Sequence, residues 1–390
     1  MNPWHLSNGL SVYLLPAEVP FTAVVLGYGV GAAHEMPATA GVAHLLEHLL
    51  FEDEEIGYDA KIQAVGGTTN AYTGQDYTVY YARLPKEQVK LALELEAARL
   101  FDLTLSPEKI AIQRQVVAEE FRERYLNPPY ADRFFHLVRM AFPQHPYGKM
   151  VIGESPEQVL SLPDEAVQRF YDSYYTPQNA ILCVSGGGID EDLSHFIQAL
   201  YGRAKGGSRA PTIESVEGLP FGERLIEREA PVPQKAVFWA YRLPPMEAPI
   251  THAVDLLDDF IGEGRSGFLT KRLVYERNVA SRLNTFVWQM HKGGLWIIEA
   301  YLPATVSIQD FEAELSAAIE ELHRSSLEEA LQLYRPLRYL SLYRERSKVL
   351  GRALALVHAV LAGHPEWYEE PLAPYEKLSE ETLRQAVHTY

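Results

Sequence analysis

The chain has 390 residues, a length that predicts two domains, and its 47% hydrophobic and 22% charged residues are typical of globular proteins. Its 52 acidic and 35 basic residues give a formal net charge of -17, which argues against a nucleic-acid-binding protein that works through a broad basic face. The single cysteine, Cys183, excludes an intramolecular disulfide framework and a cysteine-rich metal cluster, so any metal must be held by His, Asp or Glu side chains.

The first third of the sequence alternates predicted strands and helices. Residues 1–5 contain neither the basic segment nor the apolar segment of a signal peptide, so we expect a cytoplasmic protein. Apolar, β-branched runs predict strands over 10–15 and 22–30. A helical pattern covers 41–51, and residues 69–84 are again strand-like because they are rich in Tyr, Thr and Val.

Two longer helices and a short strand complete the first half. The helices are predicted over 86–103 and 107–125, and a Ser-Pro pair gives the second of them a favourable start. A short apolar strand is predicted over 179–184. Residues 206–219 lie in a stretch with few large apolar residues, and we interpret them as a linker between domains at 1–205 and 220–390.

The second half has a similar mixture of elements and a mainly helical end. Its most apolar tract, 350–363, is interrupted by Arg352 and His358, so it predicts a buried helix rather than a membrane span. The order of elements predicts an α+β fold with two domains, each a mostly antiparallel sheet with helices packed on one face. Strands are predicted over 234–241, 281–290 and 295–302, and helices over 251–261 and 268–275.

The helix predicted over 41–51 carries the motif H-x-x-E-H, formed by His44, Glu47 and His48. Histidines four residues apart share a helix face, so both imidazoles can reach one metal ion. A divalent ion lowers the pKa of a bound water, and Glu47 is placed to take its proton for attack on an amide carbonyl. The alternative is a chance match on a surface helix. Apolar residues surround the motif, however, and polar groups in such a helix need partners, which favours a metal site.

Catalytic zinc usually has three protein ligands, and the helix predicted over 107–125 offers Glu119 and Glu120 for the third. Helical periodicity places Glu119 on a charged stripe and Glu120 in an apolar arc. We therefore choose Glu120, with Gln113 two turns earlier on the same face as a residue that supports the ligands; the alternative is a salt-bridged helix glutamate. The apolar arc consists of Ile110, Val116, Val117 and Phe121.

These residues resemble those of the pitrilysin and insulysin metallopeptidases. The resemblance is strongest to the branch that contains mitochondrial processing peptidase and its small bacterial relatives. It covers both halves of the chain and is stronger in the first. The similar stretches are 29–31, 41–51, 66–73, 76–81, 145–148 and 176–179.

The resemblance implies a zinc endopeptidase with one Zn²⁺ per subunit and a homologous second domain that lacks the zinc motif. In this family the third ligand is a glutamate, which falls on Glu120, usually with another acid seven residues earlier, where this chain has Gln113. The resemblance also implies that an extended peptide adds to a sheet edge near the zinc. That edge is formed here by Asn70, Ala71, Tyr72 and Thr73.

The second half departs from the family's pattern. Active members carry an Arg followed seven residues later by a Tyr, and this pair polarises the scissile carbonyl. The matching positions here hold Val274 and Ser281. We therefore expect a heterodimer in which a homologous subunit supplies the Arg and Tyr, with a homodimer as the alternative.

The acidic run at 52–55 allows two interpretations. It is either a solvated loop or, as the resemblance suggests, a subsite for Arg or Lys in the substrate. Taken together, the sequence predicts a zinc metallopeptidase subunit that acts on unfolded peptides, without a nucleic-acid or membrane partner. The alternatives are a non-catalytic scaffold or assembly subunit of the same fold, which the intact motif argues against, and a self-sufficient homodimeric peptidase.

Overall fold

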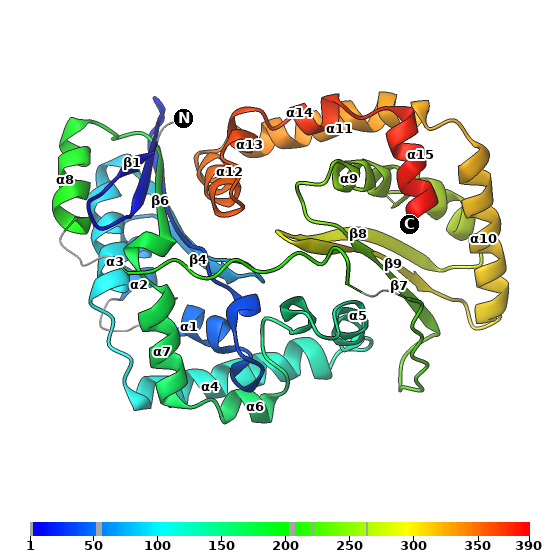
Figure 1. Ribbon diagram of the computed structural model, residues 1–390, viewed down its shortest axis with the longest axis horizontal. Helices are drawn as coiled ribbons and strands as arrows, with labels where there is room; N and C mark the ends of the chain where they lie inside the picture. The colour runs from blue at the N-terminus through cyan, green and yellow to red at the C-terminus, as the bar shows by residue number, and fades with distance from the viewer. Residues whose placement is uncertain (1–2, 52–56, 203–206, 220–221, 263) are drawn as a thin grey trace. The chain divides into compact units, whose positions relative to one another are not determined.

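The computed structural model describes residues 3–51, 57–202, 207–219, 222–262 and 264–390 (Figure 1). The chain divides into two compact units, and neither is continuous in sequence. The predicted linker at 206–219 contains the point, after Ile213, where the chain leaves unit 1 for unit 2. Unit 1 comprises Met1–Tyr125, Lys149–Ile213 and Tyr343–Glu370, and unit 2 comprises Leu126–Gly148, Glu214–Leu342 and Pro371–Tyr390.

Unit 1 is built on a six-stranded sheet with the order β1-β2-β6-β3-β5-β4 among the described residues. Its strands are β1 (Trp4–His5), β2 (Ser11–Pro16), β3 (Phe21–Tyr28), β4 (Thr68–Thr73), β5 (Thr78–Pro85) and β6 (Ala180–Gly186). Its α-helices are α1 (Val42–Phe51), α2 (Tyr58–Ala64), α3 (Val89–Phe101), α4 (Pro107–Phe121), α6 (Pro156–Leu160), α7 (Asp164–Tyr174), α8 (Glu191–Tyr201), α12 (Val349–Leu361) and α13 (Glu366–Glu369).

The pairing of this sheet is mostly antiparallel, as predicted. Only the β2–β6 pair is parallel among the described strands. The segment predicted as strand-like over 69–84 is a hairpin, because the backbone N–H of Gly74 bonds to the carbonyl of Tyr77 and turns the chain between β4 and β5. This hairpin makes β4 the last strand at one edge of the described sheet.

Both faces of the central strands are buried. On one face Val25 and Cys183 pack with Val357 of α12, the predicted buried helix, which lies beside the sheet of unit 1 in Figure 1. On the other face α3 contacts β3. Strands covered on both sides need apolar residues at successive positions, and this explains the consecutive apolar residues 23–26 in β3 and 180–184 in β6. Among the described residues, no helix is long and apolar enough to cross a membrane.

Unit 2 contains a three-stranded antiparallel sheet with the order β7-β9-β8 among the described residues. The strands are β7 (Ala236–Leu243), β8 (Arg282–Met290) and β9 (Gly293–Tyr301). The α-helices are α5 (Arg133–Ala141), α9 (Pro249–Gly262), α10 (Ile308–Arg324), α11 (Glu328–Arg346), along which the chain passes into unit 1, α14 (Ala373–Glu376) and α15 (Glu380–Thr389). A π-helical turn, Thr270–Glu276, lies where a helix was predicted over 268–275.

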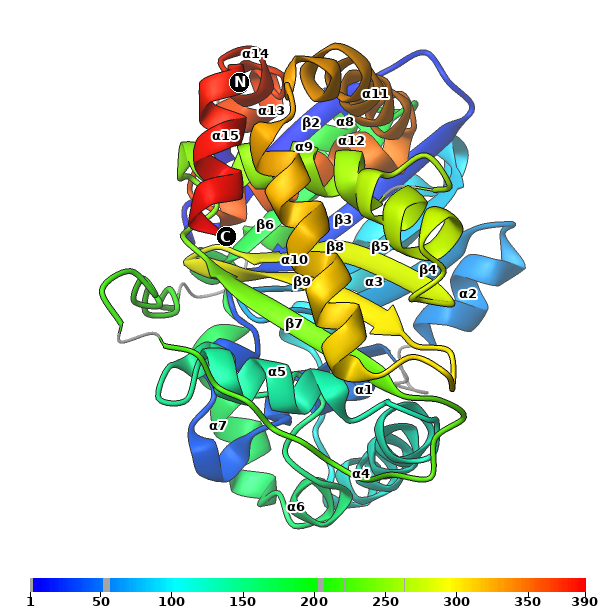
Figure 2. The same cartoon turned by 90° about the vertical axis from the view of Figure 1, so that its right-hand side faces the viewer.

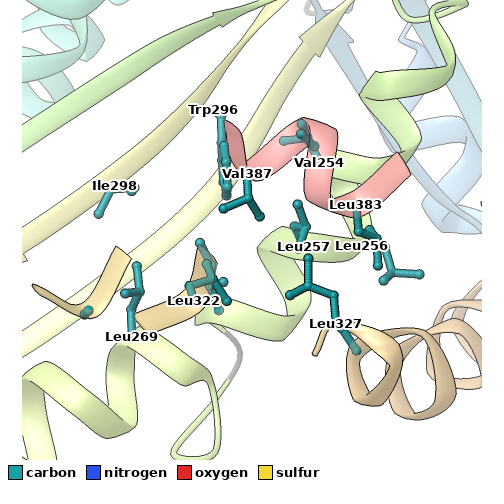
Figure 3. Packing of buried hydrophobic residues seen from close by; sticks show 14 of the residues in the cluster. Val254, Leu256, Leu257, Leu269, Trp296, Ile298, Leu322, Leu327, Leu383 and Val387 are labelled. Carbon is teal, nitrogen blue, oxygen red and sulfur yellow. The ribbon is translucent and has the colours of Figure 1, made fainter. Parts of the chain in front are cut away.

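Alternate residues of β9 point to opposite sides of this sheet. Trp296 and Ile298 join the hydrophobic core with Leu257 of α9 and Leu322 of α10 (Figure 3), and α10 crosses this side of the sheet in Figure 2. On the other side Glu299 accepts a hydrogen bond of 2.5 Å from Arg133 of α5. Both units therefore combine sheets with helices, and the predicted α+β class with two domains is confirmed.

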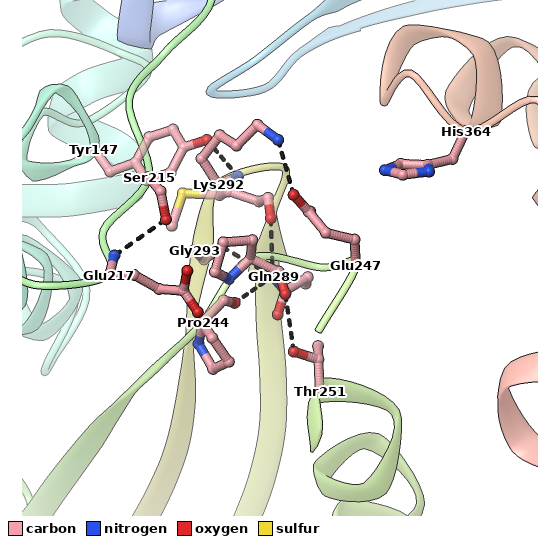
Figure 4. Close-up of polar contacts among 12 residues, drawn as sticks. Tyr147, Ser215, Glu217, Pro244, Glu247, Thr251, Gln289, Lys292, Gly293 and His364 are labelled. Atoms are coloured by element: carbon pink, nitrogen blue, oxygen red, sulfur yellow. Dashed lines mark hydrogen bonds and ion pairs between the residues drawn. The ribbon is translucent and has the colours of Figure 1, made fainter. Parts of the chain in front are cut away.

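The stretch 145–148 anchors its segment within unit 2. The Tyr147 hydroxyl accepts a hydrogen bond of 3.0 Å from the backbone N–H of Lys292, whose ammonium group in turn contacts Glu247 at 2.9 Å (Figure 4). The side-chain amide of Gln289 donates to the carbonyl groups of Pro244 and Gly293 in the same loop cluster (Figure 4). These bonds give the H-P-Y-G stretch a structural role.

Candidate metal centre

Helix α1 is buried on nearly every side. Six of its residues are buried, namely Val42, Ala43, Leu45, Leu46, Leu49 and Leu50. His44, Glu47 and His48 are partly exposed and lie on the remaining face, as residues three and four apart do on a helix. The two imidazole rings meet edge to face, with 4.8 Å between their centroids.

Glu120, near the end of α4, brings its carboxylate to both histidines. Its Oε2 lies 3.1 Å from Nε2 of His48 and 3.8 Å from Nε2 of His44. One ligand atom from each of the three residues lies within 4.8 Å of the other two. Among the described residues these are the only three His, Cys, Asp or Glu side chains that meet in this way.

The two candidate glutamates of α4 differ in exposure as their helix faces predict. The Glu119 side chain is 65% exposed and pairs with Arg122, whereas the Glu120 side chain is 15% exposed. The apolar arc differs from the prediction at one position, because Val116 is 44% exposed while Val117 is buried. The arc is therefore narrower than the sequence pattern indicated, but its buried side still includes Glu120.

Two residues, Arg124 and Gln113, contact the candidate ligands Glu120 and His48, respectively. Arg124, one turn after Glu120, places its guanidinium 2.7 Å from Oε1 of that carboxylate, so Oε2 is left to face the histidines. Gln113 lies by His48, as proposed from the sequence, and its side chain contributes to raising the pKa of that imidazole. Arg124 was missed in the sequence, although its spacing of four from Glu120 is a signal for such a pair.

The electrostatics keep one imidazole neutral and the carboxylate charged. Burial and the neighbouring His48 lower the pKa of His44 to about 4. Burial also lowers the pKa of His48, but the hydrogen bond and charge of Glu120 outweigh it and leave the pKa raised. Burial would raise the pKa of Glu120, yet the histidines and Arg124 lower it below its usual value. A cation between these groups would be attracted by the negative charge of the Glu120 carboxylate.

Glu47 lies beside the three candidate ligands and is held by β4, the strand for which the sequence resemblance implies substrate binding. The hydroxyl of Thr73, the last residue of β4, donates a hydrogen bond of 2.6 Å to Oε2 of Glu47. Burial raises the pKa of Glu47, while the bonds from Thr73 and the charge of His48 oppose that rise. A carboxylate with a raised pKa is a stronger base than an exposed one, which suits proton transfer near neutral pH.

The donor set fits a catalytic zinc ion. Two imidazoles and one carboxylate are the protein ligands of a well-known class of zinc hydrolase sites. Nδ1 of His44 is buried and has no hydrogen-bond partner among the described residues, while its Nε2 faces the carboxylate of Glu120. Nε2 of His44, Nε2 of His48 and Oε2 of Glu120 are thus directed to one place, as metal binding requires.

The edge strand β4 alternates between two surroundings. Thr69 and Thr73 bond to Asp59 of α2 and Glu47 of α1, respectively. Tyr72 points to the other face, where its hydroxyl lies 2.7 Å from Nε2 of His358 in α12. Asn70 is exposed, and its side chain accepts a bond from the backbone N–H of Ala71. The contact of Tyr72 with α12 had no signal in the sequence, because the partner comes from the other end of the chain.

Two further predicted features have different outcomes. The acidic run at 52–55 lies outside the described residues. In unit 2, Val274 is half-buried against the hydrophobic core, and the Ser281 hydroxyl donates to the backbone carbonyl of Tyr301 at 3.0 Å. Neither side chain carries a guanidinium or phenol group, so these positions supply no cationic or phenolic donor.

An inverted H-x-x-E-H helix, a carboxylate from a second helix and an adjacent edge strand together define the zinc-peptidase class of site. The family model "Insulinase (Peptidase family M16)" matches residues 15–155, and "Peptidase M16 inactive domain" matches residues 161–334. The chain belongs to peptidase family M16, the pitrilysin and insulysin family that the sequence motifs resemble.

Two relatives of this chain are named as zinc proteases. The zinc protease PqqE of Helicobacter pylori is 28% identical over 335 residues, which cover 83% of this chain and 75% of the relative. The uncharacterized zinc protease ML0855 of Mycobacterium leprae is 29% identical over 310 residues, which cover 76% and 68%.

Solved structures share the fold. A protease from Helicobacter pylori has a TM-score of 0.92 at 24% identity, with 100% of this chain and 96% of that chain covered. A chain of Complex III2 from Candida albicans has a TM-score of 0.82 at 17% identity, with 100% and 92% covered.

Proposed function

We propose that this chain is the zinc-binding subunit of a metalloendopeptidase that hydrolyses unfolded, extended peptides. The convergence of His44, His48 and Glu120, with Glu47 beside them, is the observation that carries this proposal. Membership of family M16 and relatives named as zinc proteases support it. The neutral state of His44 supports it further, because an imidazole must be deprotonated to bind a metal.

Each residue of the site has a separate role in this proposal. His44, His48 and Glu120 would hold one Zn²⁺, which when bound makes water more acidic and polarises a carbonyl oxygen. Glu47 would accept the proton from the attacking water and later give it to the leaving amine. The hydroxyl of Thr73 would keep the Glu47 carboxylate in one orientation during both transfers.

The edge strand supports a mode of substrate binding. β4 pairs with β5 on one side, and as the last described strand of the sheet it leaves the backbone groups of its other side for a further strand. An extended peptide that added there would gain main-chain hydrogen bonds along 70–73 and would lie next to Glu47. Such binding selects an unfolded segment rather than a folded protein.

The test separates metal binding from catalysis. The purified chain should contain about one zinc per subunit by mass spectrometry of metals. Glu47→Gln should keep the zinc and lower hydrolysis of a flexible peptide by about 100-fold or more, because it removes the base and no ligand. Glu120→Gln should lose zinc, whereas the exposed neighbour in Glu119→Gln should keep both zinc and activity. Zinc lost from Glu47→Gln but kept by Glu120→Gln would reverse the assigned roles.

We also propose that full activity needs a homologous partner subunit. Val274 packs against the core of unit 2, and the Ser281 hydroxyl donates to the backbone carbonyl of Tyr301, so these positions offer no guanidinium or phenol to a developing oxyanion. Loss of one such donor lowers rates by about 100- to 1,000-fold in known enzymes. The pure chain should therefore cleave flexible peptides slowly and gain activity when a homologous subunit with the Arg and Tyr is added. Full activity from the pure chain, unchanged by that partner, would refute the heterodimer and leave the self-sufficient homodimer.

A further inference from the structure

The start of α1 lacks a capping side chain of its own. The residue before the helix is Gly41, with a φ of +90°, and a Cβ at this position would lie 2.9 Å from the carbonyl oxygen of Ile152. No side chain larger than hydrogen fits there without strain, so the usual Ser, Thr or Asp cap is excluded. The first N–H groups of the helix must find acceptors elsewhere.

Glu35 supplies these acceptors from an earlier turn. Its Oε2 accepts a hydrogen bond of 2.9 Å from the N–H of Gly41, and its Oε1 accepts one of 2.8 Å from the N–H of Ala43. The residue is 5% exposed. Ala43 immediately precedes His44, so Glu35 holds the turn of the helix from which the first candidate ligand projects.

The turn that contains Glu35 is itself tied to the end of the edge strand. The ammonium group of Lys149 donates to the backbone carbonyl of Glu35. The side-chain amide of Gln75 donates to the backbone carbonyl of Lys149 at 2.8 Å. The backbone carbonyl of Gln75 accepts from the backbone N–H of Ala33 at 2.9 Å. Gln75 follows β4 by two residues, so this ring of bonds connects the helix start with the substrate strand.

We propose that Glu35, braced by Lys149, is a positioning residue that fixes α1 relative to β4 and so sets the geometry of the zinc ligands and of Glu47. This inference rests on the proposed zinc-peptidase function. Thr73 links the same two elements through Glu47 at the other end of the site. With both attachments, α1 cannot shift along its axis without breaking the hydrogen bonds of Glu35 to its first turn or the bond between Thr73 and Glu47.

The expected signature of a positioning residue is weaker zinc binding and a lower kcat at nearly constant KM. Glu35→Gln keeps the size of the side chain but leaves one acceptor oxygen where two N–H groups need one each. Its zinc affinity, measured by competition with a chromophoric chelator, should fall about 10-fold, as for residues that support metal ligands in other sites. Substitution with Co²⁺ should give a visible absorption spectrum different from that of the wild type, because the ligand geometry changes.

The matched control is Glu191→Gln, which makes the same substitution in the first turn of α8, where the glutamate is exposed. It should retain wild-type zinc affinity, Co²⁺ spectrum and kcat. If Glu35→Gln does not fold, Lys149→Met decides, because it removes the brace and leaves both bonds from Glu35 to α1. That variant should then bind zinc several-fold more weakly than the control.

The outcomes separate this inference from the proposed function. A wild-type chain that binds no zinc overturns both. A wild-type chain that binds zinc and cleaves peptides, with a folded Glu35→Gln variant equal to it in zinc affinity, Co²⁺ spectrum and kcat, overturns the positioning role alone. If Glu35→Gln does not fold and Lys149→Met does, a zinc affinity of Lys149→Met equal to that of the Glu191→Gln control overturns the positioning role in the same way.

Discussion

Replacing Arg99 by methionine should destabilise unit 1 by about 3–5 kcal/mol at neutral pH, the usual cost of removing one partner from a buried ion pair. Arg99 and Glu96, one turn apart on α3, are both 0% exposed, and their charged groups lie 3.1 Å apart. The guanidinium also stacks on the rings of Tyr58 and Tyr80, at 3.9 and 4.4 Å from their centroids. Methionine would replace the packing of the side chain but would leave the Glu96 carboxylate buried without a cation.

The same variant should show a defined pH dependence. Burial already raises the pKa of Glu96, while Arg99 and Tyr58 oppose that rise. Without Arg99, the pKa in the folded state should rise further above its unfolded value of about 4.3. A carboxyl group whose pKa is raised by folding favours the folded state below the unfolded pKa and loses that stabilisation as pH rises through the folded pKa. The deficit of Arg99→Met should therefore shrink as pH is lowered from 8 towards 5.

The assay must follow unit 1 separately. Three of the five tryptophans, Trp239, Trp288 and Trp296, lie in unit 2, so intrinsic fluorescence reports mainly on that unit. Hydrogen exchange by mass spectrometry in increasing urea, read on peptides from α3 and β5, measures the free energy of unfolding where the pair is buried. Arg83→Met, at an exposed position of β5, is the matched control and should change this free energy by less than about 0.5 kcal/mol. A loss below about 1 kcal/mol for Arg99→Met, or a loss independent of pH, would refute the buried-charge argument.

Three further predictions concern the site. Thr73→Val should lower kcat/KM about 10-fold without changing zinc content, because it removes a hydrogen bond to the Glu47 carboxylate but no ligand; lost zinc would contradict this. Gln113→Ala should weaken zinc binding about 10-fold in a chelator competition, and unchanged affinity would leave Gln113 without a role in supporting His48. If the acidic run at 52–55 forms a subsite, peptides with Arg or Lys near the cleavage point should be cut faster, and salt should reduce that advantage. If basic and acidic peptides are cut equally fast both by the wild type and by a variant with all four acids neutralised, the run is a solvated loop and not a subsite.

The features that the sequence predicted well are those encoded over one or two helical turns. The spacing of His44 and His48 alone places two imidazoles on one face, and periodicity within α4 separates Glu120 from Glu119. The error at Val116 has the same origin, because periodicity gives the direction of a side chain but not how far a neighbouring element extends over it. Exposure at the margin of a helix face depends on packing that a local pattern does not contain.

Residues that support the site from distant segments left no such pattern. A 3-10 turn, Pro37–Thr39, separates Glu35 from α1, and nothing in the neighbouring sequence indicates that the Glu35 carboxylate folds back onto Gly41 and Ala43. Thr73 was expected to bind substrate, whereas its bond to Glu47 depends on how the edge strand meets α1. The assignment of separate chain segments to the two units likewise depends on long-range burial. Helix α5 belongs to unit 2, and α12 belongs to unit 1.

Gly27 is a sequence feature whose cause, a contact with a distant helix, is identified only in the structure. It interrupts the apolar run of β3, where glycine is unfavourable for a strand. A Cβ there would lie 2.5 Å from Cγ1 of Val357 and 3.1 Å from Cδ1 of Leu361, so α12 approaches the strand more closely than any other residue would allow. A glycine inside a strand indicates close approach of some other group, but the sequence does not say which. Here the group is a helix from the far end of the chain, which covers one face of the central strands β3 and β6.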